Sequence, residues 1–280
     1  MFLNIRQLEK KLCNPFLIVV FFLVVSVNFN SVQSTELTPD VLIEEFQRYV
    51  PIYLQPPPEV VLAYANHLNQ VLDKSKIHLL SPQYIVLVDR NPKIQVALIF
   101  FGGTTLEAWQ LIGATSVSTG LPGRFDHFLT PLGVFEHSLN NLDFRAEGTK
   151  NEFGFRGYGN KGMRVYDFGW VKEPQGWGSK KMAVMRLQMH ATDPDLAEHL
   201  LGVRRSKGCI RIPSGMNTFI DHFALLDADY DAAIMTGSHF WVMLPDRSPT
   251  ANPGRYLVVI DSASKVRPNW ALPPKRNQKS

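Results

Sequence analysis

The stretch that decides the fold is His190–Arg211, HATDPDLAEHLLGVRRSKGCIR, and near its end a glycine precedes a cysteine. Gly208 lets the backbone turn tightly, so that consecutive N–H groups point into one small space before Cys209. Such a turn can stabilise a thiolate first and an acyl oxyanion later. Nearby positive charge favours the thiolate further, and it is supplied by Arg204, Arg205 and Lys207.

A histidine at the start of this stretch is the natural partner for the thiol. His190 ends a run in which Met185, Leu187 and Met189 alternate as in a strand, so the fold could return the imidazole to Cys209. Cysteine and histidine are the minimal pair for nucleophilic acyl transfer, with the thiol as nucleophile and the imidazole as base. Two other interpretations stay open: a buried, inert cysteine, and a metal site that also uses His199 and His222.

These residues and two upstream segments resemble the L,D-transpeptidase catalytic domain, the YkuD-like family. Its signature is a histidine followed at a set distance by Ser/Thr-His-Gly-Cys, which here reads His190, fifteen residues (191–205), then Ser206-Lys207-Gly208-Cys209. Lys207 stands where the family has histidine. Upstream, residues 117–123 (VSTGLPG) and 130–135 (TPLGVF) resemble the family's STG and TPxGxF segments. The resemblance covers residues 82–262.

The resemblance implies a fold that is mainly β, a YkuD-like β-sandwich with a short helix after the catalytic cysteine. Apolar runs at 84–88, 94–101, 108–118, 240–244 and 256–260 are the expected strands. A helical region is expected to precede them in residues 35–81, with a cap at Thr38 and a second helix from about Glu59 to Lys74. The glycine-rich segment 136–181 is interpreted as an irregular insertion, partly a flap over the cleft.

The resemblance also assigns roles to the residues around the thiol. The carbonyl of Ala191 would orient the imidazole, as the corresponding backbone carbonyl does in the family. The N–H groups of Gly208, Cys209 and Lys207 would form the oxyanion hole. Arg211 suits a substrate carboxylate by bidentate pairing, and Ser206 would brace the loop or contact substrate. No cofactor and no metal are implied, because a thiol and an imidazole suffice.

The function implied is that of a peptidoglycan L,D-transpeptidase, which forms an acyl-enzyme on stem peptides and passes the acyl group to an amine. That amine belongs to a second stem, giving a cross-link, or to a wall-attached protein. If water is the acceptor, the same site is an L,D-carboxypeptidase or amidase. A non-catalytic cell-wall-binding protein is the alternative from another class. Carbapenems acylate active members of the family.

The N-terminus has the features of a targeting segment. Basic residues precede an uncharged apolar run at 15–27, and small residues follow, so residues 1–34 are predicted to be a signal peptide or a retained membrane anchor. Export to the periplasm or cell envelope would follow, with membrane contact only through an uncleaved leader. Cys13 lies within this leader, which leaves Cys209 without an internal disulfide partner.

Composition and charge exclude some partners. The formal net charge is only +4 over 280 residues, without the concentrated basic stripe expected of a nucleic-acid-binding protein. The basic tail at 263–280 is expected to be disordered. The alternating acids Asp227, Asp229 and Asp231 lack the glycine and glutamate of a calcium loop and are interpreted as solvated loop carboxylates.

Overall fold

The structure, a computed structural model, describes residues 37–103 and 109–273. The expected leader, including Cys13, lies outside the described residues, as do residues 274–280 of the expected tail. Within the described ranges, no helix combines the length and apolarity that crossing a membrane requires.

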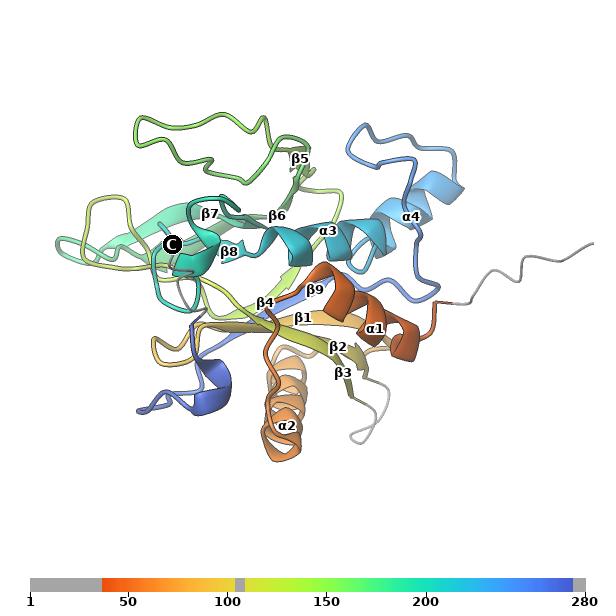
Figure 1. Ribbon diagram of the computed structural model, residues 1–280, viewed down its shortest axis with the longest axis horizontal. Coiled ribbons are helices and arrows are strands. Elements are labelled where there is room, and N and C mark those ends of the chain that lie inside the picture. Colours follow the sequence, from red (N-terminus) through yellow and green to blue (C-terminus); the bar gives the residue numbers. More distant parts are fainter. Residues whose placement is uncertain (1–36, 104–108, 274–280) are drawn as a thin grey trace, which may run out of the picture. The chain divides into compact units, whose positions relative to one another are not determined.

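The first of two sheets in the described chain has five strands in the order β3-β2-β1-β9-β4 (Figure 1). Its strands are β1 Gln83–Asp89, β2 Val96–Gly102, β3 Gln110–Ser116, β4 Gly133–Glu136 and β9 Tyr256–Ile260. β1 lies at its centre, antiparallel to β2 and parallel to β9. Tyr84 and Val86 face one hydrophobic core, whereas Ile85 and Leu87 face another. Because both faces of β1 are buried, its sequence is a continuous apolar run.

The second sheet has the order β5-β6-β7-β8. Its strands are β5 Phe144–Arg145, β6 Arg164–Pro174, β7 Met182–Ala191 and β8 Ile210–Ile212. β6 and β7 are antiparallel, and β8 joins β7 in parallel. Met189 pairs with Ile210, and both are buried in the core shared with the first sheet. Since side chains alternate along a strand, the next pair, His190 and Arg211, faces away from that core.

Helices complete both cores (Figure 1). α1, Pro39–Tyr49, begins at the predicted cap, where Thr38 Oγ1 accepts a hydrogen bond from the N–H of Val41. α1 packs on α3, Ser214–His222, with the rings of Phe46 and Phe219 5.3 Å apart. α3 is the expected short helix after the cysteine.

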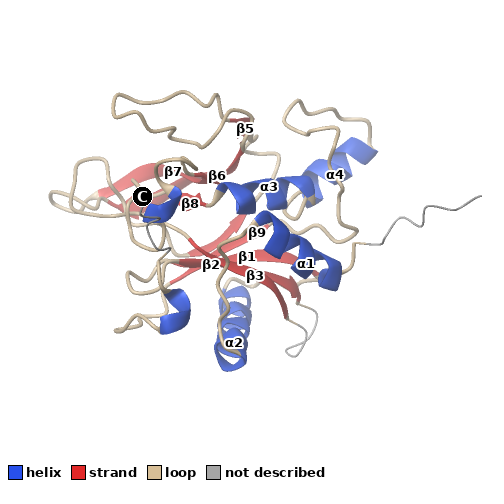
Figure 2. Cartoon of the chain, in the orientation of Figure 1, coloured by secondary structure: helices blue, strands red, loops and turns tan. Residues whose placement is uncertain are grey.

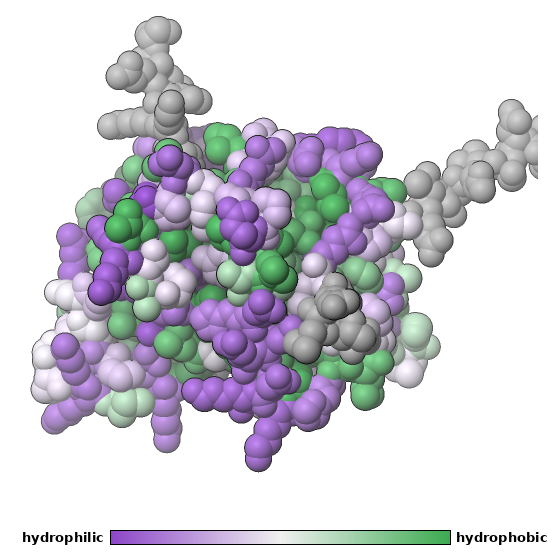
Figure 3. All heavy atoms as spheres, turned by 90° about the horizontal axis from the view of Figure 1, so that it is seen from below, coloured by the Kyte–Doolittle hydropathy of each residue, from purple (hydrophilic) through white to green (hydrophobic). Residues whose placement is uncertain are grey.

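The second helix of the N-terminal region, α2, Pro58–Lys74, covers the opposite face of the five-stranded sheet. Its buried side chains are those that the helical spacing predicts, including Tyr64, Leu68 and Leu72. The face seen in Figure 3 mixes hydrophilic and hydrophobic residues rather than presenting one continuous apolar surface.

The remaining helices are α4, Ala228–Met235, and the short 3₁₀ helices η1, Glu198–Leu200, and η2, Asn269–Ala271. The expected mainly-β fold is therefore correct in its two sheets but too narrow, since the described chain is a mixed α/β domain. Residues 240–244, expected to be a strand, form turns with Trp241 exposed and Val242 buried. The interpretation of 136–181 as irregular is also wrong in part, because β6 is a long central strand; most of 146–163, between β5 and β6, is loop (Figure 2).

Residues 263–273 differ from the disordered tail expected from their composition. Arg267 donates hydrogen bonds to the carbonyls of Gly202 (2.9 Å) and Ala271 (2.8 Å). The ring of Trp270 packs edge-on against Tyr64 of α2. Charge alone does not predict disorder here, because the guanidinium satisfies backbone carbonyls and the indole buries apolar surface.

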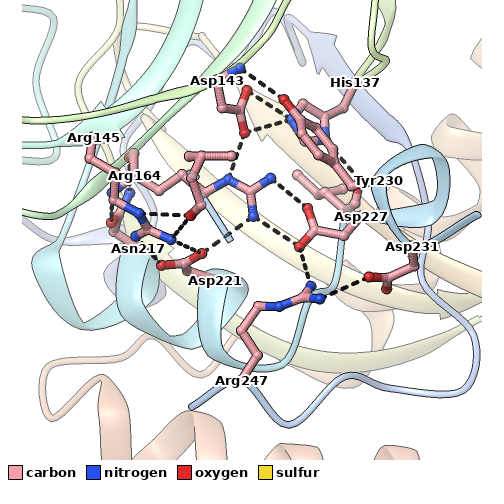
Figure 4. A network of polar contacts seen from close by, with 12 residues as sticks. His137, Asp143, Arg145, Arg164, Asn217, Asp221, Asp227, Tyr230, Asp231 and Arg247 are labelled. Carbon is pink, nitrogen blue, oxygen red and sulfur yellow. Dashed lines mark hydrogen bonds and ion pairs between the residues drawn. The ribbon is translucent and has the colours of Figure 1, made fainter. Parts of the chain in front are cut away.

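A buried ion-pair network joins the second sheet to α3 and α4 (Figure 4). Arg164 is fully buried; its Nε lies 2.6 Å from Asp143 Oδ2 and its Nη2 2.8 Å from Asp227 Oδ1. Asp221 of α3 accepts a third hydrogen bond, and His137 Nε2 lies 2.9 Å from both carboxylate oxygens of Asp143. The network is buried away from solvent, so each charged side chain depends on its ion-pair partners for stabilisation.

This network overturns the interpretation of the three alternating acids as solvated loop carboxylates. Asp227 is buried between Arg164 and Arg247, and Asp231 lies in α4 at 3.1 Å from Arg247. Asp229, also in α4, pairs with Arg255. Their basic partners are distant in sequence, so spacing alone could not reveal the pairs.

Candidate functional site

The predicted nucleophile and base lie on neighbouring strands of the second sheet. Cys209 directly precedes β8, and His190 on β7 pairs in register with Arg211. The alternation along β8 directs Cys209 and Arg211 to the face that carries His190. Cys209 is partly exposed, whereas His190 is only 4% exposed. The fold thus brings together two residues that the sequence separates by a long loop.

The imidazole of His190 is held in one tautomer. Its Nδ1 lies 2.7 Å from the carbonyl oxygen of Ala191, which can only accept, so Nδ1 carries the proton. This is the contact that the predicted orienting role of Ala191 requires. Burial lowers the pKa of His190 to about 4, and the Arg211 guanidinium acts in the same direction, against the Ala191 hydrogen bond. The ring is therefore neutral at pH 7, with its free lone pair on Nε2.

The thiol of Cys209 is also neutral at rest. Burial raises its pKa, and the backbone N–H of Gln188 and the charge of Arg211 only partly oppose this rise. Its Sγ lies 3.9 Å from the carbonyl of Arg186; among the described residues it makes no hydrogen bond to His190. Desolvation thus outweighs the nearby positive charge that favours a thiolate.

The basic flank contributes less than its sequence suggests. Arg204 turns away to the carbonyl of Arg90 (2.9 Å), and Lys207 pairs with Asp126 at 2.9 Å on the exposed surface. Arg205 acts on a neighbour instead: burial lowers the pKa of Arg211, and the charge of Arg205 lowers it further. The side chain of Lys207 thus lies at the surface rather than against Cys209.

The loop before Cys209 is braced from within. Ser206 is buried; its Oγ accepts from the N–H of Gly208 (3.1 Å) and donates to the carbonyl of Cys209. The hydroxyl of Ser206 therefore braces the loop, and its contact with substrate stays a prediction. The predicted oxyanion role of Gly208 is weakened as well, since its N–H is already bonded; the N–H groups of Lys207 and Cys209 stay predicted donors.

The upstream segments that carry the resemblance also meet this loop. Ser118 pairs with Arg211, and Gly120 bridges to Ser206. Thr130 Oγ1 donates to the carbonyl of Gly208 at 2.7 Å. A side chain at Gly120 would lie 2.1 Å from a backbone carbonyl oxygen, that of Phe128, so only glycine allows this approach.

Arg211 is the charged side chain best placed for a ligand. It is partly exposed on the face that carries Cys209, and burial lowers the pKa of its guanidinium. Within the described ranges it forms no ion pair, whereas Arg186 is bound to Asp167 at 2.7 Å. A guanidinium in this position can bind a carboxylate bidentately.

Residues that sequence reasoning missed also line this face. Tyr158, from the loop between β5 and β6, packs its ring against His190, with centroids 4.6 Å apart. Its hydroxyl bonds to Gln188, which bonds in turn to the buried Asp167 of β6. The period-two alternation of β7 places Gln188 on the same face as His190 and could have indicated it; nothing local marks Tyr158.

Among the residues that the structure describes, no three His, Cys, Asp or Glu side chains are grouped to hold a metal ion. His199 lies in η1 and His222 stacks on Tyr49. The zinc alternative that joins them to Cys209 therefore has no geometric support in these ranges.

Comparisons with known proteins give only distant structural likenesses. No family model matches the sequence, and no curated protein matches it. Among solved structures, the chain is similar to the helical cell shape determining protein Pgp2 from Campylobacter jejuni, with 13% identity and a TM-score of 0.29. A point mutant of the same protein gives 13% identity and 0.30. Each alignment covers 84% of this chain and 58% of the Pgp2 chain. This chain therefore spans little more than half of the length of Pgp2.

Proposed function

We propose that the protein is a cysteine-dependent peptidoglycan L,D-transpeptidase of the YkuD-like family, acting through an acyl-enzyme on stem peptides. The observation that carries this proposal is the locked tautomer of His190 beside Cys209. With Nδ1–H held by the carbonyl of Ala191, Nε2 is the ring atom able to take the thiol proton. The neutral thiol and neutral imidazole form a general-base pair rather than a preformed ion pair.

The reaction proceeds in two acyl transfers. Cys209 Sγ attacks the amide carbonyl after the third residue of the stem as its proton passes to Nε2 of His190. The C–N bond then breaks, and the imidazolium returns the proton to the departing D-alanine amine. An acceptor amine next attacks the thioester, gives its proton to Nε2, and releases the thiol, which regains that proton.

Binding of the stem peptide is assigned to Arg211. Its guanidinium lies beside the nucleophile and is free of an ion pair among the described residues. A carboxylate of the stem would neutralise it and lie on the face of Cys209. The acceptor is an amine of a second stem or of a wall-attached protein. Since this substrate lies outside the cytoplasm, we also propose export to the periplasm or cell envelope.

Product analysis tests the proposal. The chain from residue 37, which forms one compact unit, is incubated with purified tetrapeptide muropeptides, and products are identified by mass spectrometry. We expect cross-linked dimers or D-amino-acid exchange products with the wild type and with His239→Gln, a control at an exposed histidine. Cys209→Ala and His190→Gln should give neither.

The other outcomes separate the alternatives. Tripeptides alone would identify water as the acceptor and the protein as an L,D-carboxypeptidase or amidase. Equal product formation by Cys209→Ala would remove the thiol from the mechanism. Binding to isolated peptidoglycan without any turnover of muropeptides would favour a non-catalytic cell-wall-binding protein.

A further inference from the structure

A tyrosine from the loop 146–163 covers the base. The ring of Tyr158 meets the imidazole of His190 edge-on, with 4.6 Å between centroids and 65° between planes. His190 is 4% exposed and Tyr158 40% exposed. The phenol ring is thus the partly exposed group against the buried imidazole, and it contributes to the low hydration of His190.

The tyrosine is fixed at both ends. Its hydroxyl bonds to Gln188 Oε1 at 3.2 Å, and Gln188 Nε2 bonds to Asp167 Oδ2 at 2.8 Å. The backbone is held as well, because a side chain at Gly159 would lie 2.7 Å from Cβ of Ala191. Gly159 also has a φ of +83°, which favours glycine. The loop therefore approaches β7 as closely as a backbone can.

We infer that Tyr158 is a positioning residue for His190: its ring keeps water off the imidazole, and its hydroxyl, bonded to Gln188, fixes the ring there. The inference concerns a property of His190 itself. It rests on the proposed function only where it extends to the choice between amine and water as acyl acceptor.

Charged groups around the imidazole act alongside the ring. Arg211, on the paired strand, opposes protonation of His190. Asp167 on β6 would favour it, but Arg186 neutralises that carboxylate at 2.7 Å. Cys209 is neutral at rest because burial raises its pKa. These charged groups influence the pKa of His190, but the exclusion of water is assigned to the ring of Tyr158.

Exclusion of water has a chemical consequence once the acyl-enzyme has formed. A water molecule at Nε2 would add to the thioester carbonyl and give its proton to His190. The C–S bond would then break, and His190 would return the proton to the thiolate, so the net reaction is hydrolysis. Because the ring takes up space beside the imidazole, it disfavours free water as the acceptor relative to an amine that the enzyme binds.

The first test measures the pKa of His190 without any turnover. Histidine resonances are titrated by NMR in the full chain carrying Cys209→Ala, and the His190 signal is assigned with His190→Gln. We expect a pKa near 4 with Tyr158 present and a shift toward the ordinary 6.5 in Tyr158→Ala. Tyr158→Phe, which keeps the ring and loses its anchor, should shift it in the same direction by less.

A matched control lies in the same loop. Phe153→Ala removes an aromatic ring that is 72% exposed, and it should leave the His190 titration unchanged. An unchanged titration in Tyr158→Ala would overturn the inference. If the alanine variant does not fold, Tyr158→Leu and Tyr158→Phe decide by the same measure.

The second test follows the products. With tetrapeptide and an excess of a D-amino acid, the ratio of exchange product to tripeptide should fall in Tyr158→Ala and stay near the wild-type ratio in Phe153→Ala. An unchanged ratio would contradict the extension to acceptor choice. If the wild type forms no product, the proposed function fails, whereas the NMR titration still decides the role of Tyr158.

Discussion

Thr130 donates its hydroxyl hydrogen to the carbonyl oxygen of Gly208, 2.7 Å away, and accepts a hydrogen bond from the N–H of Gly120. One buried side chain therefore joins the two upstream segments to the loop that carries Cys209. The position of the thiol depends on this link and on the Ser206 brace within the loop.

Replacement of Thr130 by valine keeps the shape and removes both hydrogen bonds. Two buried backbone groups lose their partner, so the free energy of unfolding should fall by about 1–3 kcal/mol. Urea unfolding measures the change. Thr218→Val, at an exposed helix position, is the control and should change the stability far less. Equal effects of the two variants would show that Thr130 does not hold the loop.

The buried network predicts a large cost for Arg164→Met. Its removal leaves the buried Asp143 with His137 alone and Asp227 with Arg247 alone, and breaking such a buried pair typically costs about 3–5 kcal/mol. Arg48→Met is the control, since the Arg48 side chain is 73% exposed and its pair with Glu45 is worth about 1 kcal/mol or less. Chemical denaturation of both variants gives the comparison, and a small loss at Arg164 would mean that the network is dispensable.

The neutral thiol predicts how alkylation depends on pH. Because burial raises the pKa of Cys209, its rate of reaction with iodoacetamide should keep rising through pH 9. The chain from residue 37 has this single cysteine, so total incorporation reports the site. A rate that levels off near neutral pH would instead indicate a preformed thiolate.

The buried imidazole makes stability depend on pH with a definite sign. The folded pKa of His190, about 4, lies below the unfolded value of about 6.5, so the unfolded state binds the proton first as pH falls. The free energy of unfolding that the neutral imidazole contributes is fully present above about pH 6.5. It is lost between about pH 6.5 and pH 4, by up to about 3 kcal/mol. The wild type should therefore lose more stability than His190→Gln between pH 7.5 and 4. Parallel curves for the two proteins would contradict the shift.

The sequence predicts those parts of the fold and the site that depend on patterns among neighbouring residues. The alternation before His190 predicted its strand, the glycine–cysteine turn predicted the loop, and helical spacing predicted the buried face of α2. The sequence favours a thiolate at Cys209 because positive charge can be read from neighbouring residues, whereas burial, which raises the pKa of this thiol, depends on the whole fold. Arg204 and Lys207 lie close to Cys209 in the sequence, yet their side chains bind partners elsewhere.

Long-range packing explains the other differences. Tyr158 reaches His190 because its loop packs on β7, and nothing in the glycine-rich segment records that approach. The acids in and just before α4 are paired with arginines from distant segments, and Arg267 satisfies carbonyls of two other loops. Such contacts join residues far apart along the chain, so local composition predicts neither the buried network nor the ordered part of the tail.

The central claim is that Cys209 forms an acyl-enzyme with His190 as its base. Intact-protein and peptide mass spectrometry after incubation with a carbapenem tests it most directly, because the adduct is covalent and stays on the attacked residue. We predict one adduct on the peptide that contains Cys209, absent in Cys209→Ala, slowed in His190→Gln and unchanged in His239→Gln. An adduct that persists in Cys209→Ala would contradict the claim, as would an unmodified thiol in a protein that processes muropeptides.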